Sequence, residues 1–253
     1  MDLRRFQVRE DKTLLVGDVL GDTTDLSLLM LHGAGKADRS RFSPLRKKLW
    51  TKGISSLAFD FMSYGESTGD RRISSLENQT EQACRVVKSQ KFKEPLSVIG
   101  ASMGAYIAVK LLAHFPVDNL ILFVPAMYSI DACKLPFNNG FTQTIQKLSS
   151  WINSDAWKLL SMFTGNLVLV IAQKDVVIPT DVIERINHAA ANANSKTIIT
   201  IPRAPHGILD FLANDSHGYM SRVMKTIVPL MDKKSTRPMQ AQGIYRTRKL
   251  YSI

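Results

Sequence analysis

A serine between two glycines carries the strongest chemical signal in this chain. Ser102 lies in residues 100–104 (GASMG), directly after the apolar run 96–101 and before an apolar, helix-like stretch. The pattern G-x-S-x-G at a strand-to-helix turn indicates an exposed serine nucleophile, because the glycines let neighbouring backbone approach closely. The sharp turn strains the serine backbone, and the N-terminus of the following helix favours a developing negative charge. We therefore predict that Ser102 is a nucleophile.

A serine hydroxyl needs a base that takes its proton and an acid that orients the base. Asp175 follows the apolar run 167–172, and His206 follows the apolar run 197–201. The chain order Ser, Asp, His is the one expected when the nucleophile occupies such a turn. Both residues come after the carboxyl ends of predicted strands, so their loops lie at one edge of a sheet. We predict a triad of Ser102, His206 and Asp175.

Other acids could take the orienting role. Asp181 or Asp210 could replace Asp175, although Asp181 begins a predicted helix and Asp210 lies only four residues from His206. Surface positions are expected for the remaining histidines after the nucleophile, which are His114, His188 and His217.

Acyl transfer also needs backbone N–H donors for the oxyanion. Met103 follows the nucleophile and can offer one of them. We expect the second donor from residues 32–35 (HGAG), which end the apolar run 26–31, and within them from Ala34. Small residues there let a backbone N–H point into the site. His32 could be mistaken for a base, but we expect it to shape this loop.

Short apolar runs alternate with amphipathic stretches along the whole chain. Apolar runs without polar alternation are typical of strands buried on both faces of a parallel sheet. The predicted strands are residues 3–9, 13–20, 26–31, 54–61, 96–101, 120–124, 167–172 and 197–201. The predicted helices are residues 43–52, 74–90, 103–115, 180–191 and 216–231. This alternation predicts an α/β fold with an open, mostly parallel sheet and helices on both faces.

Residues 126–165 interrupt this alternation, because connections in α/β units usually have about two to six residues. Phe141, Ile145, Leu148 and Ile152 have helical spacing within the segment. We expect a helical insertion. A cap over the site and ordinary core packing are both compatible with it, since ligands of α/β sheets bind beyond the carboxyl ends of the strands.

The composition indicates a globular chain with a single domain over residues 1–231. Of its 253 residues, 45% are hydrophobic and 22% are charged, which is enough to bury a core. No apolar run reaches the ~20 residues of a membrane-spanning helix, and the N-terminus does not resemble a secretory signal. Cys84 and Cys133 have no metal-binding spacing, so no metal site is predicted. We expect a soluble, cytoplasmic protein.

The formal net charge of +11 is concentrated in two segments. Residues 36–52 hold seven Lys or Arg against one Asp, and residues 232–253 hold six against one. We expect a solvated basic face, with contact to an anionic surface or substrate as the alternative, and we do not expect nucleic acid as a partner. Residues 232–253 are polar and contain Gly and Pro, so we expect a flexible tail.

Together these motifs resemble the α/β-hydrolase superfamily. More narrowly, they resemble the serine hydrolases grouped with monoacylglycerol lipase and the serine aminopeptidase-like esterases. The resemblance covers residues 3–231, and the segments 32–35 and 100–104 are its most specific matches. Residues 60–67 (DFMSYGES) match the D-x-x-G-x-G-x-S turn of that group, except that Ser63 replaces the first glycine.

The resemblance implies an α/β-hydrolase fold with eight strands, a short helical cap, and hydrolysis through an acyl-enzyme without metal or organic cofactor. Ser102 would attack, His206 would act as general base and then general acid, and Asp175 would hold the imidazole. The preferred prediction is an esterase or small lipase for carboxylic esters of small or medium acyl chains. An acyl-CoA or acyl-protein thioesterase is the alternative, for which the basic segment 36–52 could meet a phosphate. A non-catalytic binding protein on the same fold is the third possibility.

Overall fold

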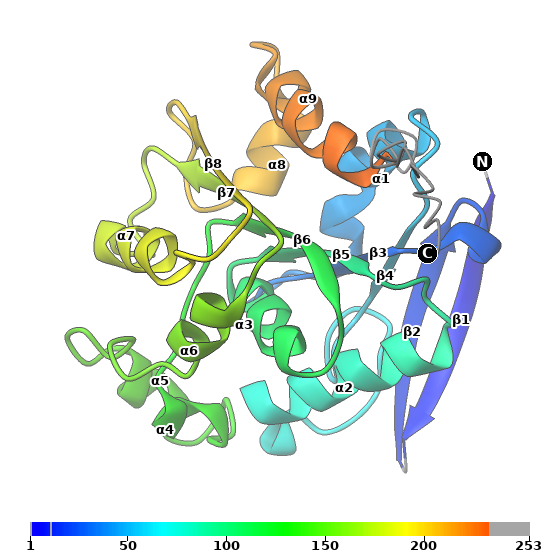
Figure 1. The fold of residues 1–253 in the computed structure, drawn as a ribbon. Coiled ribbons are helices and arrows are strands. Elements are labelled where there is room, and N and C mark those ends of the chain that lie inside the picture. Colours follow the sequence, from blue (N-terminus) through cyan, green and yellow to red (C-terminus); the bar gives the residue numbers. More distant parts are fainter. Residues whose placement is uncertain (1, 11, 233–253) are drawn as a thin grey trace, which may run out of the picture.

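Eight strands form one sheet in the order β1-β2-β4-β3-β5-β6-β7-β8. The computed structural model describes residues 2–10 and 12–232, so the predicted tail from residue 233 onward lies outside the described residues. Strands β1 and β2 are antiparallel to each other, β2 is antiparallel to β4, and all other neighbours are parallel. The predicted mostly parallel α/β sheet is thus confirmed (Figure 1).

Each predicted strand has a counterpart in the sheet. The bounds are β1 (Leu3–Glu10), β2 (Thr13–Leu20), β3 (Leu28–Leu31), β4 (Ser56–Phe59), β5 (Leu96–Ala101), β6 (Val117–Phe123), β7 (Asn166–Ala172) and β8 (Ser195–Ile201). The main difference concerns β6, which begins three residues before the expected position and stops before Val124. Val124 has a φ of 40°, a left-handed conformation that no strand residue adopts.

Helices cover both faces of the sheet (Figure 1). One face carries α1 (Ser43–Trp50), α8 (Ile208–Ala213) and α9 (Tyr219–Met231). The other carries α2 (Leu76–Ser89), α3 (Met103–Lys110), α6 (Ala156–Met162) and α7 (Thr180–Ala189). Successive residues of β3 alternate between the two cores: Leu28 and Met30 face the α1 side, and Leu29 and Leu31 face the α3 side. Burial on both faces explains why these strands are continuous apolar runs.

The segment between β6 and β7 holds α4 (Ile130–Cys133), α5 (Phe141–Ile145) and α6. The expected helical stripe continues only to Ile145, so its extension to Ile152 is wrong. Turns follow α5, Ser149 has a φ of 54°, and Leu148 is 97% exposed. The apolar spacing beyond Ile145 therefore does not mark a buried helix face.

Polar contacts tie this segment to α3. The Tyr106 hydroxyl donates to Asp155 Oδ1 at 2.8 Å, and the Lys110 ammonium pairs with the same carboxylate. Cys133 Sγ lies 3.1 Å from the Tyr106 hydroxyl, and burial raises the pKa of this thiol. Tyr106 is fully buried, so α3 is a firm support for the first and last helices of the segment.

Among the described residues, no helix combines the length and the apolar character that crossing a membrane requires.

Candidate active site

Ser102 occupies a strained turn between β5 and α3. Its backbone has φ 51° and ψ −116°, outside the regions that side-chain-bearing residues favour. The turn is tight because α3 starts against β3: a Cβ at Gly104 would collide with the carbonyl oxygen of Leu31. The Ser102 N–H donates to the carbonyl of Phe123 on the neighbouring strand at 2.9 Å. This geometry is the one expected from the glycine spacing.

His206 connects the serine to a carboxylate. Its Nε2 lies 3.0 Å from Ser102 Oγ, and its Nδ1 lies 2.9 Å from Asp175 Oδ2. The side chains of His206 and Asp175 are 25% and 10% exposed, so the carboxylate is sheltered while the imidazole reaches the surface. The structure thus brings together the three residues that the sequence proposes.

The second carboxylate oxygen of Asp175 holds its own loop. Asp175 Oδ1 accepts the N–H groups of Val177 at 2.8 Å and Ile178 at 3.0 Å. The backbone therefore fixes the rotamer of this side chain, and the other oxygen remains for the imidazole. Each carboxylate oxygen has a separate task, one structural and one directed at His206.

Gln173, which sequence reasoning missed, joins the acid loop to the histidine loop. Its side-chain Oε1 accepts the N–H of Arg203 at 2.9 Å, and its own N–H donates to Ile201 at 3.1 Å. The Lys174 N–H also donates to Ala204 at 2.9 Å. These bonds continue the β7–β8 pairing beyond the strands and hold the two loops in register. The only signal in the sequence that points to Gln173 is its position directly after β7.

The alternative acids do not contact His206. Asp181 is exposed in the first turn of α7, and Asp210 pairs with Arg41 across the surface. The other histidines expected at the surface are exposed there, namely His114, His188 and His217. Helix α8, which follows His206 directly, is absent from the predicted elements.

Met103 and Ala34, the expected oxyanion donors, both lie in segments that contact Ser102 or its neighbours. Met103 is the first residue of α3, and a helix provides no internal acceptor for its first N–H groups. Gly33 lies against the nucleophile, since a Cβ built on it would be 3.2 Å from Ser102 Cβ. Ala34, the next residue, is exposed. Neither the Met103 nor the Ala34 amide donates a hydrogen bond within residues 2–10 and 12–232, which leaves both as candidate donors.

His32 is a structural residue of the same loop. It is 1% exposed, and its Nε2 accepts the N–H of Phe61 at 3.1 Å, so this nitrogen carries no proton. The proton therefore sits on Nδ1 and donates to the Gly33 carbonyl at 2.7 Å. Burial lowers the pKa of His32, in agreement with a neutral ring. The prediction that His32 shapes the loop fits these contacts.

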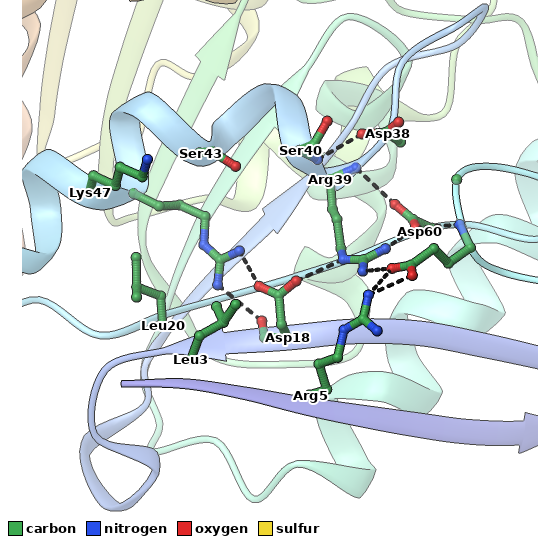
Figure 2. Close-up of a pocket in the computed structure, with 13 residues that line it drawn as sticks. Leu3, Arg5, Asp18, Leu20, Asp38, Arg39, Ser40, Ser43, Lys47 and Asp60 are labelled. Carbon is green, nitrogen blue, oxygen red and sulfur yellow. Dashed lines mark hydrogen bonds and ion pairs between the residues drawn. The ribbon is translucent and has the colours of Figure 1, made fainter. Parts of the chain in front are cut away.

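Buried ion pairs hold the chain that follows this loop (Figure 2). The Arg39 side chain reaches Asp18 at 2.7 Å, and it also pairs with Asp60 and Glu66. Its backbone N–H donates to Asp60 Oδ1 at 2.8 Å. Burial opposes the charge of Arg39, but hydrogen bonds to Glu66 and Asp18 raise its pKa. Arg46 pairs with Asp18 as well, so that carboxylate serves two arginines.

These side chains line a cavity of about 400 Å³ that is separate from the triad. Its arginines already have carboxylate partners (Figure 2). We assign them a structural role: they fix residues 36–42 against the turn at residues 60–67.

Ser63, which stands in place of a glycine in that turn, has a φ of 64°. The serine therefore adopts the left-handed conformation that favours glycine, and its hydroxyl donates to the Gly69 carbonyl at 3.1 Å.

Comparison with known proteins agrees with this architecture. The model of a family described as an alpha/beta hydrolase domain matches residues 24–128, which include Ser102 but neither Asp175 nor His206. No curated protein matches the chain by sequence. Solved structures that resemble it have low sequence identity, so they inform the fold alone.

Three of these structures illustrate the likeness. A putative lipase from Acinetobacter baumannii AYE has a TM-score of 0.70 and 16% identity over 90% of this chain and 91% of its own. A thermophilic esterase from Thermogutta terrifontis has a TM-score of 0.68 and 14% identity over 90% of this chain and 99% of its own. A thioesterase domain from the curacin biosynthetic pathway has a TM-score of 0.66 and 15% identity over 89% of this chain and 100% of its own. The chain thus has the alpha/beta hydrolase fold, and its residues 24–128 match the model of an alpha/beta hydrolase domain.

Proposed function

We propose that this protein is a serine hydrolase that cleaves carboxylic esters of small or medium acyl chains through an acyl-enzyme. The observation that carries the proposal is the continuous contact from Ser102 Oγ through both nitrogens of His206 to Asp175, with distances of 3.0 and 2.9 Å. Such a chain of contacts converts a weak hydroxyl into a nucleophile at neutral pH.

In the first half-reaction, Ser102 Oγ attacks the ester carbonyl while its proton passes to His206 Nε2. Asp175 holds Nδ1–H and stabilises the imidazolium. The carbonyl oxygen becomes an oxyanion that accepts N–H groups from Met103 and Ala34. When the tetrahedral intermediate collapses, the leaving alcohol takes the proton from Nε2, and the acyl group stays on Oγ.

In the second half-reaction, water attacks the acyl-enzyme. His206 takes a proton from the water and returns it to Ser102 Oγ as the acid product leaves. The same two N–H donors stabilise the second oxyanion. No metal or organic cofactor is needed for these steps.

The segment 126–165 is proposed as a cap that sets acyl-chain preference. It begins at the nucleophile, because the Ala126 N–H donates to the Ser102 carbonyl at 3.2 Å. It also contributes aromatic side chains: Tyr128 lies 5.4 Å from Tyr106 and 5.5 Å from Phe141, measured between ring centroids. We propose that apolar side chains of this segment contact the acyl chain of the substrate.

The names of the similar structures support hydrolysis of either an ester or a thioester. The narrower resemblance to the monoacylglycerol lipase group favours the ester. The composition of the basic segment 36–52 suggests a site for the phosphates of CoA. However, Arg39 and Arg46 make buried ion pairs and Arg41 pairs with Asp210, so these three arginines already have carboxylate partners. We therefore place the ester first.

A substrate panel on wild type and Ser102→Ala tests the proposal. p-Nitrophenyl esters from two to sixteen carbons and the matching acyl-CoA thioesters are compared at equal concentration. Ser102→Ala should lower kcat by about 10⁴-fold or more, with an unchanged circular dichroism spectrum. Ser89→Ala, an exposed serine at the end of α2, is the matched control and should retain activity. Preference for thioesters would replace the ester proposal, and activity on neither class would favour a binding protein.

A further inference from the structure

Five basic side chains without an ion-pair partner lie together on one face of the described chain. Lys47, Lys48 and Lys52 lie on α1 and the turn after it, and Arg222 and Lys225 lie on α9. All five are exposed. Within residues 2–10 and 12–232, none of them forms an ion pair. We call these five residues the α1–α9 cationic face.

Helices α1 and α9 pack side by side on the same side of the sheet (Figure 1). Neither helix contains Asp or Glu, nor does the turn from Thr51 to Ile54. The face is therefore a continuous area of one charge rather than a mixture of ion pairs. A surface of this kind attracts anions over roughly one Debye length, about 8–10 Å at physiological salt.

The sequence that follows α9 extends this charge. Residues 233–253 contain six Lys or Arg and no Asp or Glu. The cationic face and the sequence that follows α9 together carry eleven of the 33 Lys and Arg of the chain.

A groove of about 520 Å³ runs between the two helices. Lysines form its rim, and its floor is apolar, with Met224 and Val228 from α9. Met224 is 8% exposed and belongs to the core on this side of the sheet. The groove thus combines apolar contact with a cationic border, which is the arrangement that an anionic amphiphile matches.

Charge repulsion excludes two candidate ligands of the groove, a second copy of this chain and the chain's own residues 233–253. A second copy that docks through the same cationic face would be repelled, and so would residues 233–253, whose charged side chains are all positive. None of the described residues that line the groove has an aromatic side chain on which a nucleic-acid base could stack. An anionic lipid surface meets both requirements, since phosphate groups pair with lysines and acyl chains contact an apolar floor.

We propose that the α1–α9 cationic face docks this protein on a membrane surface rich in anionic phospholipid. Lys48, Lys52 and Lys225 contact headgroup phosphates around the groove. Each such lysine or arginine contributes on the order of a fivefold increase in partitioning. The face contains no residue of the triad, so docking and hydrolysis are separable properties.

Vesicle binding by the full-length protein tests this proposal. Flotation with phosphatidylcholine vesicles is compared with flotation on vesicles that contain 30% phosphatidylserine, in low and in high salt. Wild type should bind only the anionic vesicles and should dissociate as salt rises. Lys48→Gln with Lys225→Gln should lower the partition coefficient by about 30-fold. The corresponding Glu pair should lower it further.

A second pair of neutralised lysines, outside the cationic face, distinguishes binding through this face from binding that depends only on net charge. Lys88 on α2 and Lys158 on α6 are exposed on the opposite side of the sheet. Lys88→Gln with Lys158→Gln removes the same charge and should change partitioning by less than about threefold. Turnover of a short, water-soluble ester should be unchanged in Lys48→Gln with Lys225→Gln. The unfolding temperature should be unchanged in both pairs, which shows that the variants fold.

Three outcomes would overturn the proposal. Equal losses in the two lysine pairs would mean that binding follows net charge alone. Equal binding to neutral and anionic vesicles would remove the role of phosphate contacts. Tight binding of a single-stranded oligonucleotide that depends on Lys48 and Lys225, without vesicle binding, would identify the face as a nucleic-acid site instead.

Discussion

Replacing Arg39 by Met should destabilise the protein by about 3–5 kcal/mol, because it leaves a carboxylate buried without a cation. Arg39 is 8% exposed, and Asp60 is 0% exposed. Among the described residues, Arg39 is the one ion-pair partner of Asp60, whereas Asp18 keeps Arg46 after the substitution. Glu66 is 48% exposed and retains Arg5, so its loss is small. The penalty therefore comes mainly from Asp60.

Arg5→Met is the matched control for this prediction (Figure 2). Arg5 contacts the same Glu66, but its side chain is 62% exposed. Exposed ion pairs contribute about 0–1 kcal/mol, so this variant should lose no more than that. Both variants remove one arginine from one network, and the difference between them reports burial rather than charge.

The assay is urea unfolding followed by tryptophan fluorescence, with the slopes checked for agreement before free energies are compared. The double variant Arg39→Met with Asp60→Asn removes both partners and should cost about 2 kcal/mol less than the sum of the single variants. A loss below about 1 kcal/mol in Arg39→Met, equal to that in Arg5→Met, would refute the reasoning. Additivity within about 0.5 kcal/mol would refute the coupling.

Further predictions concern the loop histidine, the end of α2 and the orienting acid. Burial lowers the pKa of His32, so the unfolded chain binds more protons below about pH 6.5, and the free energy of unfolding should fall there by up to about 1.4 kcal/mol per pH unit. His32→Gln should flatten this slope in urea titrations between pH 5 and 7, and an unchanged slope would contradict the assignment. Lys91, with a φ of 50°, ends α2 in a left-handed conformation, so Lys91→Gly should raise the free energy of unfolding by about 1 kcal/mol. Lys88→Gly inside α2 should lower it by a similar amount, and changes of the same sign would be inconsistent with this view. Asp175→Asn should lower kcat by about 10⁴-fold with little change in KM, while Asp210→Asn should leave kcat unchanged; equal effects in a steady-state ester assay would reject Asp175 as the orienting acid.

The sheet was predictable because its strands are buried on both faces. Residues 96–101 form β5 with the predicted bounds, and each of the other apolar runs also contains a strand. The positions of Asp175 and His206 followed from the same logic, since parallel strands bring their carboxyl-end loops to one edge. Helix α8 was missed because it has six residues and no side-chain N-cap. The expected helix through Ile152 failed because apolar spacing does not distinguish a buried face from an exposed turn.

Polar contacts between distant segments were not predictable. Arg39 and Asp60 are 21 residues apart, and their pairing depends on β2, β4 and the turn at residues 60–67 meeting in space. Gln173 and Arg203 are 30 residues apart, and only the β7–β8 register brings them together. Neither pair has a periodic signature, because each interaction is specified by two side chains rather than by a repeated pattern. The three-dimensional fold is needed to identify such contacts.

Covalent labelling with a fluorophosphonate probe tests the central proposal, an activated Ser102, most directly. The probe reacts with serines that a general base has activated, and mass spectrometry of the labelled peptide identifies the site. We predict stoichiometric labelling of Ser102 in the wild type and no labelling of Ser102→Ala at the same probe concentration. Absence of labelling in folded wild type, or labelling that persists in Ser102→Ala, would contradict the proposed triad.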